Sequence, residues 1–156
     1  MSPPPFESLL REHQGSLHRY LVFLVGRDDA PDCLQETLIA ALRAYPPSAD
    51  DNLRAWLFTI AHHKGIDHHR RRVRRAVPTA SLADVGISPA EPDLDLWRVV
   101  SRLPTKQRGA VTLRFAGDLA YAEIASVLDV TEAAARQNVR AGLRNLRTML
   151  GEEAPT

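Results

Sequence analysis

"EIASVLDVTEAAARQNVRAGLRNLR", residues 123–147, contains the pattern that decides the fold of the second half of the chain. A short apolar helix before Asp129, a three-residue turn and a long helix capped by Thr131 have the dimensions of a helix-turn-helix. Along the long helix, arginines recur at spacings of four, four and three residues, so they lie along one side of it. They are Arg136, Arg140, Arg144 and Arg147.

This arginine row predicts a negatively charged partner. A DNA major groove accepts such a helix, and the residues near the helix N-terminus then point at base edges. The same pattern also fits arginines that only solvate an exposed face, so the motif leaves both interpretations open. The residues expected at base edges are Glu132, Ala133, Arg136, Gln137 and Arg140, while Arg144 and Arg147 are better placed for phosphates or a partner.

Upstream of this motif, apolar residues at helical spacing predict two more helices, one ending before Pro104 and one closed by Gly117. We expect Thr105 to cap the second of these and Asp118 to open the short helix that follows. Residues 76–97 carry four acidic and no basic side chains together with three prolines, which is typical of a linker. We therefore expect domains at 1–75 and 95–156, joined by a linker at 76–94.

The first 75 residues predict three packed helices. Apolar stripes run from Phe6 to Leu24, from Cys33 to Leu42 and from Leu53 to Ala61. Gly65 should weaken the third helix locally. Because no strand pattern of useful length occurs anywhere, the chain is expected to be all-α, with two small helical domains.

The third helix ends in "RRRVRR", residues 70–75, where five guanidinium groups repel one another. A nucleic-acid phosphate backbone relieves such repulsion, and we expect this contact at Arg70 and Arg71. A solvated, frayed helix end explains the last two arginines equally well. Phe58 lies off the apolar stripe and fits either core packing or base stacking.

The sequence predicts no enzyme. It has no HExxH motif, Cys/His framework, glycine-rich phosphate loop or catalytic triad order, so we expect no catalytic residue, cofactor, metal or small-molecule substrate. The lone Cys33 excludes an internal disulfide, and no signal peptide or membrane-spanning run is recognisable. A cytoplasmic location is expected.

Three stretches, in this order, resemble the bacterial sigma-70 family. "DAPDCLQETLIAAL" (29–42) resembles the second helix of sigma domain 2, and "LRAWLFTIAHHKGIDHHRRRVRR" (53–75) is similar to the promoter-melting helix that follows it. The stretch from Leu103 to Arg147 resembles sigma domain 4. A short chain with only a linker between these domains is similar to the extracytoplasmic-function (ECF) group.

The resemblance implies a sigma factor that binds core RNA polymerase, recognises minus-35 and minus-10 promoter elements and initiates transcription of a specific regulon. It implies contacts with the β′ clamp helices, the β flap and promoter DNA, an anti-sigma factor as a further partner, and a linker that threads the polymerase channel. Polymerase binding is implied for Asp32, Gln35 and Glu36. Minus-10 binding is implied for the loop 47–52 and for Arg54, His63, Lys64, Asp67, Arg70 and Arg71, and minus-35 binding for Arg136, Gln137 and Arg140.

The chain departs from the family at His63, where many relatives have Asn, and at Asp129, where glycine is common. Asp tolerates the left-handed backbone of such a turn. Two other hypotheses remain open. One is a stand-alone helix-turn-helix regulator that binds duplex DNA without polymerase, and the other is a sigma mimic that captures an anti-sigma factor.

Overall fold

The computed structural model describes residues 3–48, 52–75 and 93–153. Within these ranges the chain forms seven helices and no strand, which confirms the all-α expectation. The predicted linker falls outside the described residues up to position 92, and a helix already begins at Asp93. The helices are α1 Phe6–Val25, α2 Ala30–Ala44, α3 Leu53–Arg75, α4 Asp93–Ser101, α5 Thr105–Phe115, α6 Tyr121–Leu128 and α7 Glu132–Glu153.

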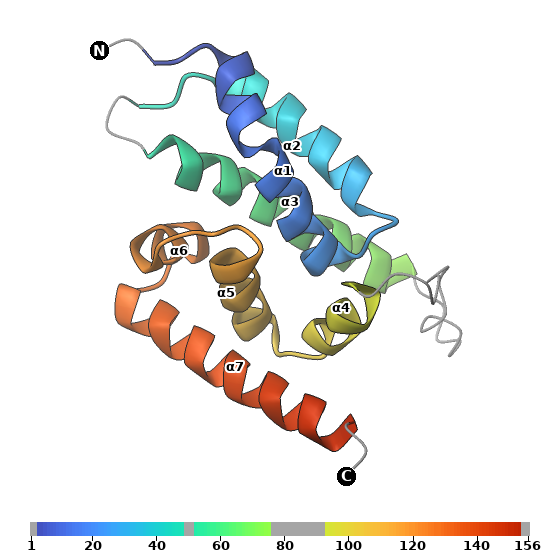
Figure 1. Cartoon of the computed structure of the whole chain (residues 1–156). Helices are drawn as coiled ribbons and strands as arrows, with labels where there is room; N and C mark the ends of the chain where they lie inside the picture. Colours follow the sequence, from blue (N-terminus) through green and yellow to red (C-terminus); the bar gives the residue numbers. More distant parts are fainter. Residues whose placement is uncertain (1–2, 49–51, 76–92, 154–156) are drawn as a thin grey trace.

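Helices α1, α2 and α3 pack against one another and form the first half of the molecule (Figure 1). Gly26 ends α1 with a positive φ of 96°, a conformation that suits glycine. Asn52 caps α3, because its side-chain oxygen accepts a hydrogen bond of 3.0 Å from the backbone N–H of Ala55. Both residues are of types that commonly end or cap helices.

Helix α3 is continuous through Gly65, where a local weakness was predicted. A Cβ atom at this position would collide with the Leu24 side chain of α1. The absence of a side chain therefore lets α3 lie close against α1, and the packing compensates for the low helix propensity of glycine.

The second half consists of α4 to α7, with α7 lying along α5 and α6 (Figure 1). Two predicted caps are wrong. Pro104 occupies the cap position of α5 and Thr105 is already helical, while α6 begins at Tyr121 after Ala120. Asp118 instead lies in the preceding loop with φ 58°, so its role is to turn the chain.

The two halves share one hydrophobic core rather than standing apart. Its cluster joins Tyr20 of α1 and Phe58 of α3 to Leu113, Leu119 and Ile124 of the second half. Figure 1 shows α6 beside α3 and α5 beside α1. Phe58 is fully buried at this junction, so the structure supports core packing for it and not base stacking.

Candidate nucleic-acid interface

Helices α6 and α7 form the predicted helix-turn-helix. Asp129 ends α6 in the left-handed conformation, with φ 55° and ψ 51°, and the N–H of Val130 donates to Ala125 C=O at 3.0 Å. Thr131 then caps α7, accepting a 3.0 Å hydrogen bond from the N–H of Ala134. Ile124 of α6 and Val139 of α7 are buried in the same hydrophobic cluster. The turn has no glycine, yet its backbone takes the conformation that glycine favours.

The N-terminal part of α7 presents a polar surface to solvent. All five residues that were expected at base edges are exposed, and the arginine row continues, also exposed, toward the C-terminus. The core side of the helix carries the buried Ala135, Val139 and Leu146, whereas Leu150, one turn beyond Leu146, is 47% exposed. The exposed set comprises Glu132, Ala133, Arg136, Gln137 and Arg140.

Arg136 is held in place within the motif. Its Nη2 donates a 2.8 Å hydrogen bond to the Glu132 carboxylate, one turn earlier in α7. Its guanidinium carbon also lies 4.6 Å from the ring centroid of Tyr121, and Arg114 approaches the same ring at 4.6 Å. Sequence reasoning missed Tyr121 and Arg114, because their spacing in the chain gives no signal of a contact with Arg136.

The predicted minus-10 residues of α3 do not all share one side of the helix. His63, Asp67 and Arg70 are exposed along one stripe, with Lys64 half-buried beside it. Arg54 stands nine residues before His63, which at 100° per residue puts it on the opposite side. The structure therefore places His63, Asp67 and Arg70 together on one side of α3 and Arg54 on the other.

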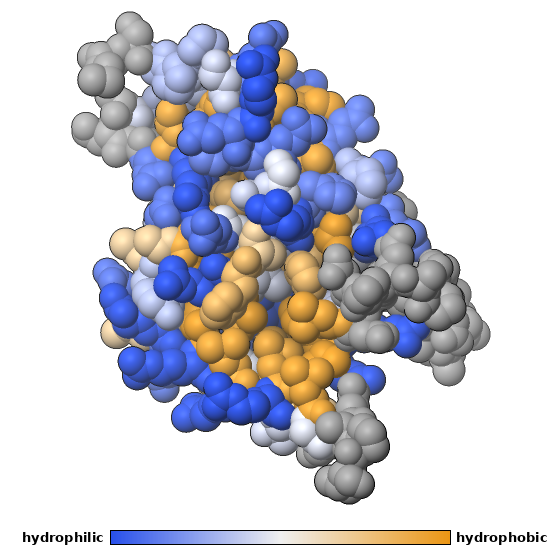
Figure 2. Space-filling view, viewed as in Figure 1, coloured by the Kyte–Doolittle hydropathy of each residue, from blue (hydrophilic) through white to orange (hydrophobic). Residues whose placement is uncertain are grey.

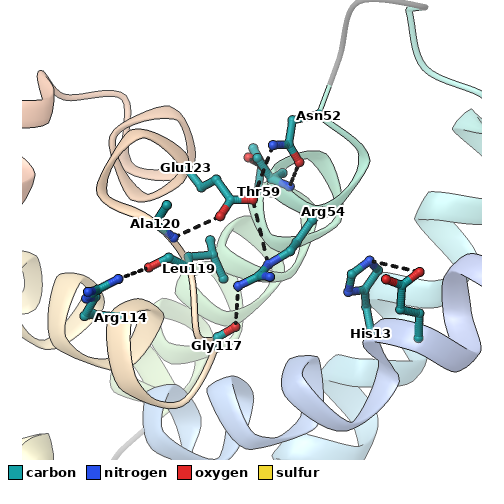
Figure 3. Close-up of polar contacts among 11 residues, drawn as sticks. His13, Asn52, Arg54, Thr59, Arg114, Gly117, Leu119, Ala120 and Glu123 are labelled. Carbon is teal, nitrogen blue, oxygen red and sulfur yellow. Dashed lines mark hydrogen bonds and ion pairs between the residues drawn. The ribbon is translucent and has the colours of Figure 1, made fainter.

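Arg54 instead contacts the second half (Figure 3). Its Nη2 donates to Gly117 C=O at 3.3 Å, and its Nε lies 3.7 Å from the Glu123 carboxylate. Asn52, at the edge of the predicted minus-10 loop, donates to the same carboxylate at 3.3 Å. Residues 49–51 of that loop lie outside the described residues. Two residues implicated in minus-10 binding are thus engaged with the helix-turn-helix half.

An open groove of about 480 Å³ lies between helices α2 and α3. Asp32, Gln35 and Glu36, the predicted polymerase contacts, line it from α2, and His68, Arg71 and Arg72 line it from α3. Arg71 lies 3.6 Å from the Glu36 carboxylate. This ion pair joins a residue predicted to bind minus-10 DNA to a residue predicted to bind polymerase. On α2, Ile39 and Leu42 are 43% and 60% exposed, so the α2 surface combines carboxylates with accessible apolar side chains. Protein interfaces commonly combine an apolar core with a polar rim.

His62 lies at the junction of the halves. The Tyr20 hydroxyl and His62 Nδ1 are 2.6 Å apart, and a Cβ atom on Gly109 of α5 would lie 3.8 Å from the His62 ring. Burial, with a smaller contribution from the neighbouring His63, lowers the pKa of His62 to about 4. The imidazole is therefore neutral at neutral pH. Burial also lowers the pKa of the Arg108 guanidinium, whose Nη1 donates to Ser101 C=O at 3.0 Å.

Among the described residues, no group of three or more His, Cys, Asp or Glu side chains is placed to hold a metal ion. None of the helices that the structure describes is long and apolar enough to span a bilayer.

Figure 2 shows an apolar surface over the lower part of the molecule, bordered by polar residues.

Comparison with known proteins identifies two family matches and close relatives. Residues 9–75 match the family Sigma-70 region 2, and residues 93–146 match Sigma-70, region 4. The chain is 32% identical to the ECF RNA polymerase sigma factor SigM of Mycobacterium tuberculosis, over 94% of this chain and 77% of SigM. It is also 32% identical to the ECF RNA polymerase sigma factor BldN of Streptomyces coelicolor, over 96% of this chain, but spans 61% of the length of BldN.

The fold also has solved counterparts. The sigma factor RpoE of Bartonella quintana, crystallised with the anti-sigma factor NepR, superposes with a TM-score of 0.76 over 94% of this chain and 96% of RpoE. The sequence identity is 23%, so this likeness concerns the fold.

Proposed function

The chain belongs to the sigma-70 family, in its ECF group, and we propose that it binds core RNA polymerase and directs it to promoters with minus-35 and minus-10 elements. The protein itself supplies recognition, and the polymerase supplies the chemistry. We place it in the cytoplasm, where the polymerase works, and assign it no catalytic residue of its own.

The observation that carries this proposal is the exposed N-terminal part of α7 in a complete helix-turn-helix. Arg136, Gln137 and Arg140 are exposed together, and arginine forms bidentate hydrogen bonds with guanine in the major groove. Arg144 and Arg147, further along the helix, are suited to phosphates. We assign the minus-35 element to this surface, together with Glu132 and Ala133.

For the minus-10 element we propose the exposed stripe of α3, formed by His63, Asp67 and Arg70, together with Lys64 and Arg71. Holding an unpaired strand has to offset the loss of base stacking, which is on the order of 1 to 2 kcal/mol per step. Arg54 and the loop 47–52 join this site only after they release Glu123 and Gly117.

For polymerase binding we propose the groove-lining Asp32, Gln35 and Glu36 of α2. These residues face the β′ clamp helices, and the β flap is a second contact, made by the other half of the molecule.

An anti-sigma factor is the further partner that we propose. RpoE of Bartonella quintana, which shares this fold, was solved with such a factor. The compact packing of the two halves in this structure fits a sigma factor held in a state that does not engage a promoter.

Run-off transcription with purified core polymerase tests the proposed function. Wild-type protein should start transcripts from a promoter selected from genomic fragments, while Arg136→Ala and Arg140→Ala should each weaken promoter binding by about 1 to 3 kcal/mol. Arg11→Ala, at an exposed arginine of α1, is the matched control and should leave binding unchanged. Duplex binding that needs no polymerase would favour the stand-alone regulator, and anti-sigma binding without transcripts would favour the mimic.

A further inference from the structure

The ring of Tyr121 connects three elements around the helix-turn-helix. Tyr121 is the first residue of α6, and its half-buried side chain packs against the core. Arg114 reaches the ring from α5 and Arg136 reaches it from α7, each with its guanidinium carbon 4.6 Å from the ring centroid. Both distances are within the range of a cation–π interaction.

The Tyr121 ring is held more firmly than the Arg136 side chain that it contacts. The N–H of Ala120 donates a 2.9 Å hydrogen bond to Glu123, which fixes the start of α6, as Figure 3 shows. In the same view Arg114 Nη1 donates to Leu119 C=O at 3.0 Å, so this guanidinium is held at the ring by the loop. Arg136, by contrast, is on the exposed side of α7, where an arginine side chain otherwise samples many rotamers.

Two groups restrict Arg136. Glu132 holds it from the same helix at 2.8 Å, and Tyr121 holds it from the other helix of the motif. Arg140, one turn further along α7, is also exposed but has no such ring contact within the described residues. Arg140 therefore serves as a natural reference for an arginine without a ring.

We propose that Tyr121 is a positioning residue for minus-35 recognition, which presents the Arg136 guanidinium in a fixed place ahead of DNA binding. An arginine that is already ordered loses less conformational freedom when it meets a base. The inference rests on the proposed function in one respect, namely that Arg136 faces promoter DNA. The stacking itself is independent of that function.

Nuclear magnetic resonance of the free full-length protein tests the stacking. The Arg136 Nε–H resonance should carry a ring-current shift in the wild type and in Tyr121→Phe, which keeps the aromatic face. The shift should disappear in Tyr121→Leu, while the Arg140 resonance stays where it was. An Arg136 resonance that does not move in Tyr121→Leu overturns the inference. Tyr121→Met replaces the leucine variant if thermal unfolding shows that the latter does not fold.

A double-mutant cycle tests the consequence for recognition, using holoenzyme assembled with full-length protein and a promoter duplex. Tyr121→Leu should weaken binding about two- to fivefold, the factor that corresponds to one exposed cation–π contact. In an Arg136→Ala background the same change should have no further effect, whereas in Arg140→Ala it should keep its full effect. Equal losses in all backgrounds would mean that Tyr121 acts independently of Arg136 and would overturn the proposal.

The two levels of failure are distinguishable. If Arg136→Ala weakens promoter binding and Tyr121→Leu does not, the positioning role fails and the proposed function stands. If Arg136→Ala itself leaves binding unchanged while the ring-current shift is present, the minus-35 assignment of Arg136 fails, and the positioning role fails with it.

Discussion

His62 illustrates how a single side chain connects the two halves of the molecule. It is hydrogen-bonded to the buried Tyr20 and packs near Gly109 across the junction. The neighbouring His63 adds a smaller effect in the same direction, because its charge disfavours a protonated imidazole at His62. Burial costs the charged imidazole its hydration, so the folded protein holds it in the neutral form.

This predicts a pH dependence of stability with a definite sign. The pKa of His62 is about 4 in the folded protein and about 6.5 when unfolded. Between these values the unfolded state binds more protons, so the contribution of His62 lowers the stability by up to about 1.4 kcal/mol per pH unit as the pH drops from 6.5 toward 4. His62→Gln keeps a hydrogen-bonding side chain without the titration. Urea unfolding of both proteins at several pH values should show the wild type losing its advantage toward pH 4, and a constant difference would contradict the assignment.

Local signals at single residues were predictable, and long-range contacts were not. The turn at Asp129 and the caps at Asn52 and Thr131 follow from residue types within a few positions of one another. The partner of Arg54 stands 69 positions away in the chain, at Glu123, and no periodicity within α3 indicates it. Since α3 is covered by α1 and α2 as well as by α6, one apolar stripe could not reveal both of its buried sides.

At the scale of helices, the contact between α5 and α7 depends on a glycine. A Cβ atom on Gly142 would lie 2.5 Å from Val111 Cγ2, and valine has little rotamer freedom in a helix. Gly142→Ala should therefore lower stability by about 1 kcal/mol or more, although alanine is the better helix former by about 1 kcal/mol. Thermal unfolding measures the change.

Gly15 of α1 is the matched control for this substitution. It is exposed, and the nearest atom to an added Cβ would be Arg19 Nη1 at an ordinary 3.7 Å. Gly15→Ala should raise the stability by up to about 1 kcal/mol. If both glycine variants were stabilised equally, the close approach of α5 and α7 would not be what selects Gly142.

The α2 surface gives a prediction on partner binding. Gln35 is exposed and Glu36 makes one half-exposed ion pair with Arg71, a contact worth less than about 1 kcal/mol. Gln35→Ala and Glu36→Lys should therefore keep the fold but weaken core polymerase binding about tenfold, if this surface is a centre of the interface. Affinity measured by titrating labelled polymerase checks this. The exposed Gln14→Ala and Glu7→Lys of α1 are matched controls, and equal weakening by them would remove the special role of α2.

At the scale of the whole molecule, the closed packing conflicts with the distance between the two promoter elements. A compact chain of this length has a radius of gyration of about 15 Å and measures about 40 Å across. Elements centred about 25 base pairs apart are separated by about 85 Å along straight duplex. The two halves must therefore separate before both elements can be bound, and the contacts of Glu123 with Asn52 and Arg54 must break.

A covalent bridge across this junction should consequently block transcription. In Asn52→Cys/Glu123→Cys, a short thiol crosslinker joins positions whose side chains are 3.3 Å apart in the native protein. Cys33 does not compete, because it is buried and burial raises the pKa of its thiol to about 12. We expect the crosslinked protein to lose run-off transcription with core polymerase. The same double variant without crosslinker and each single variant treated with it set the reference activity, because they carry the same substitutions but their halves remain free to separate. A crosslinked protein that transcribes as well as these controls would show that the closed arrangement is compatible with promoter binding, and the distance argument would then be wrong.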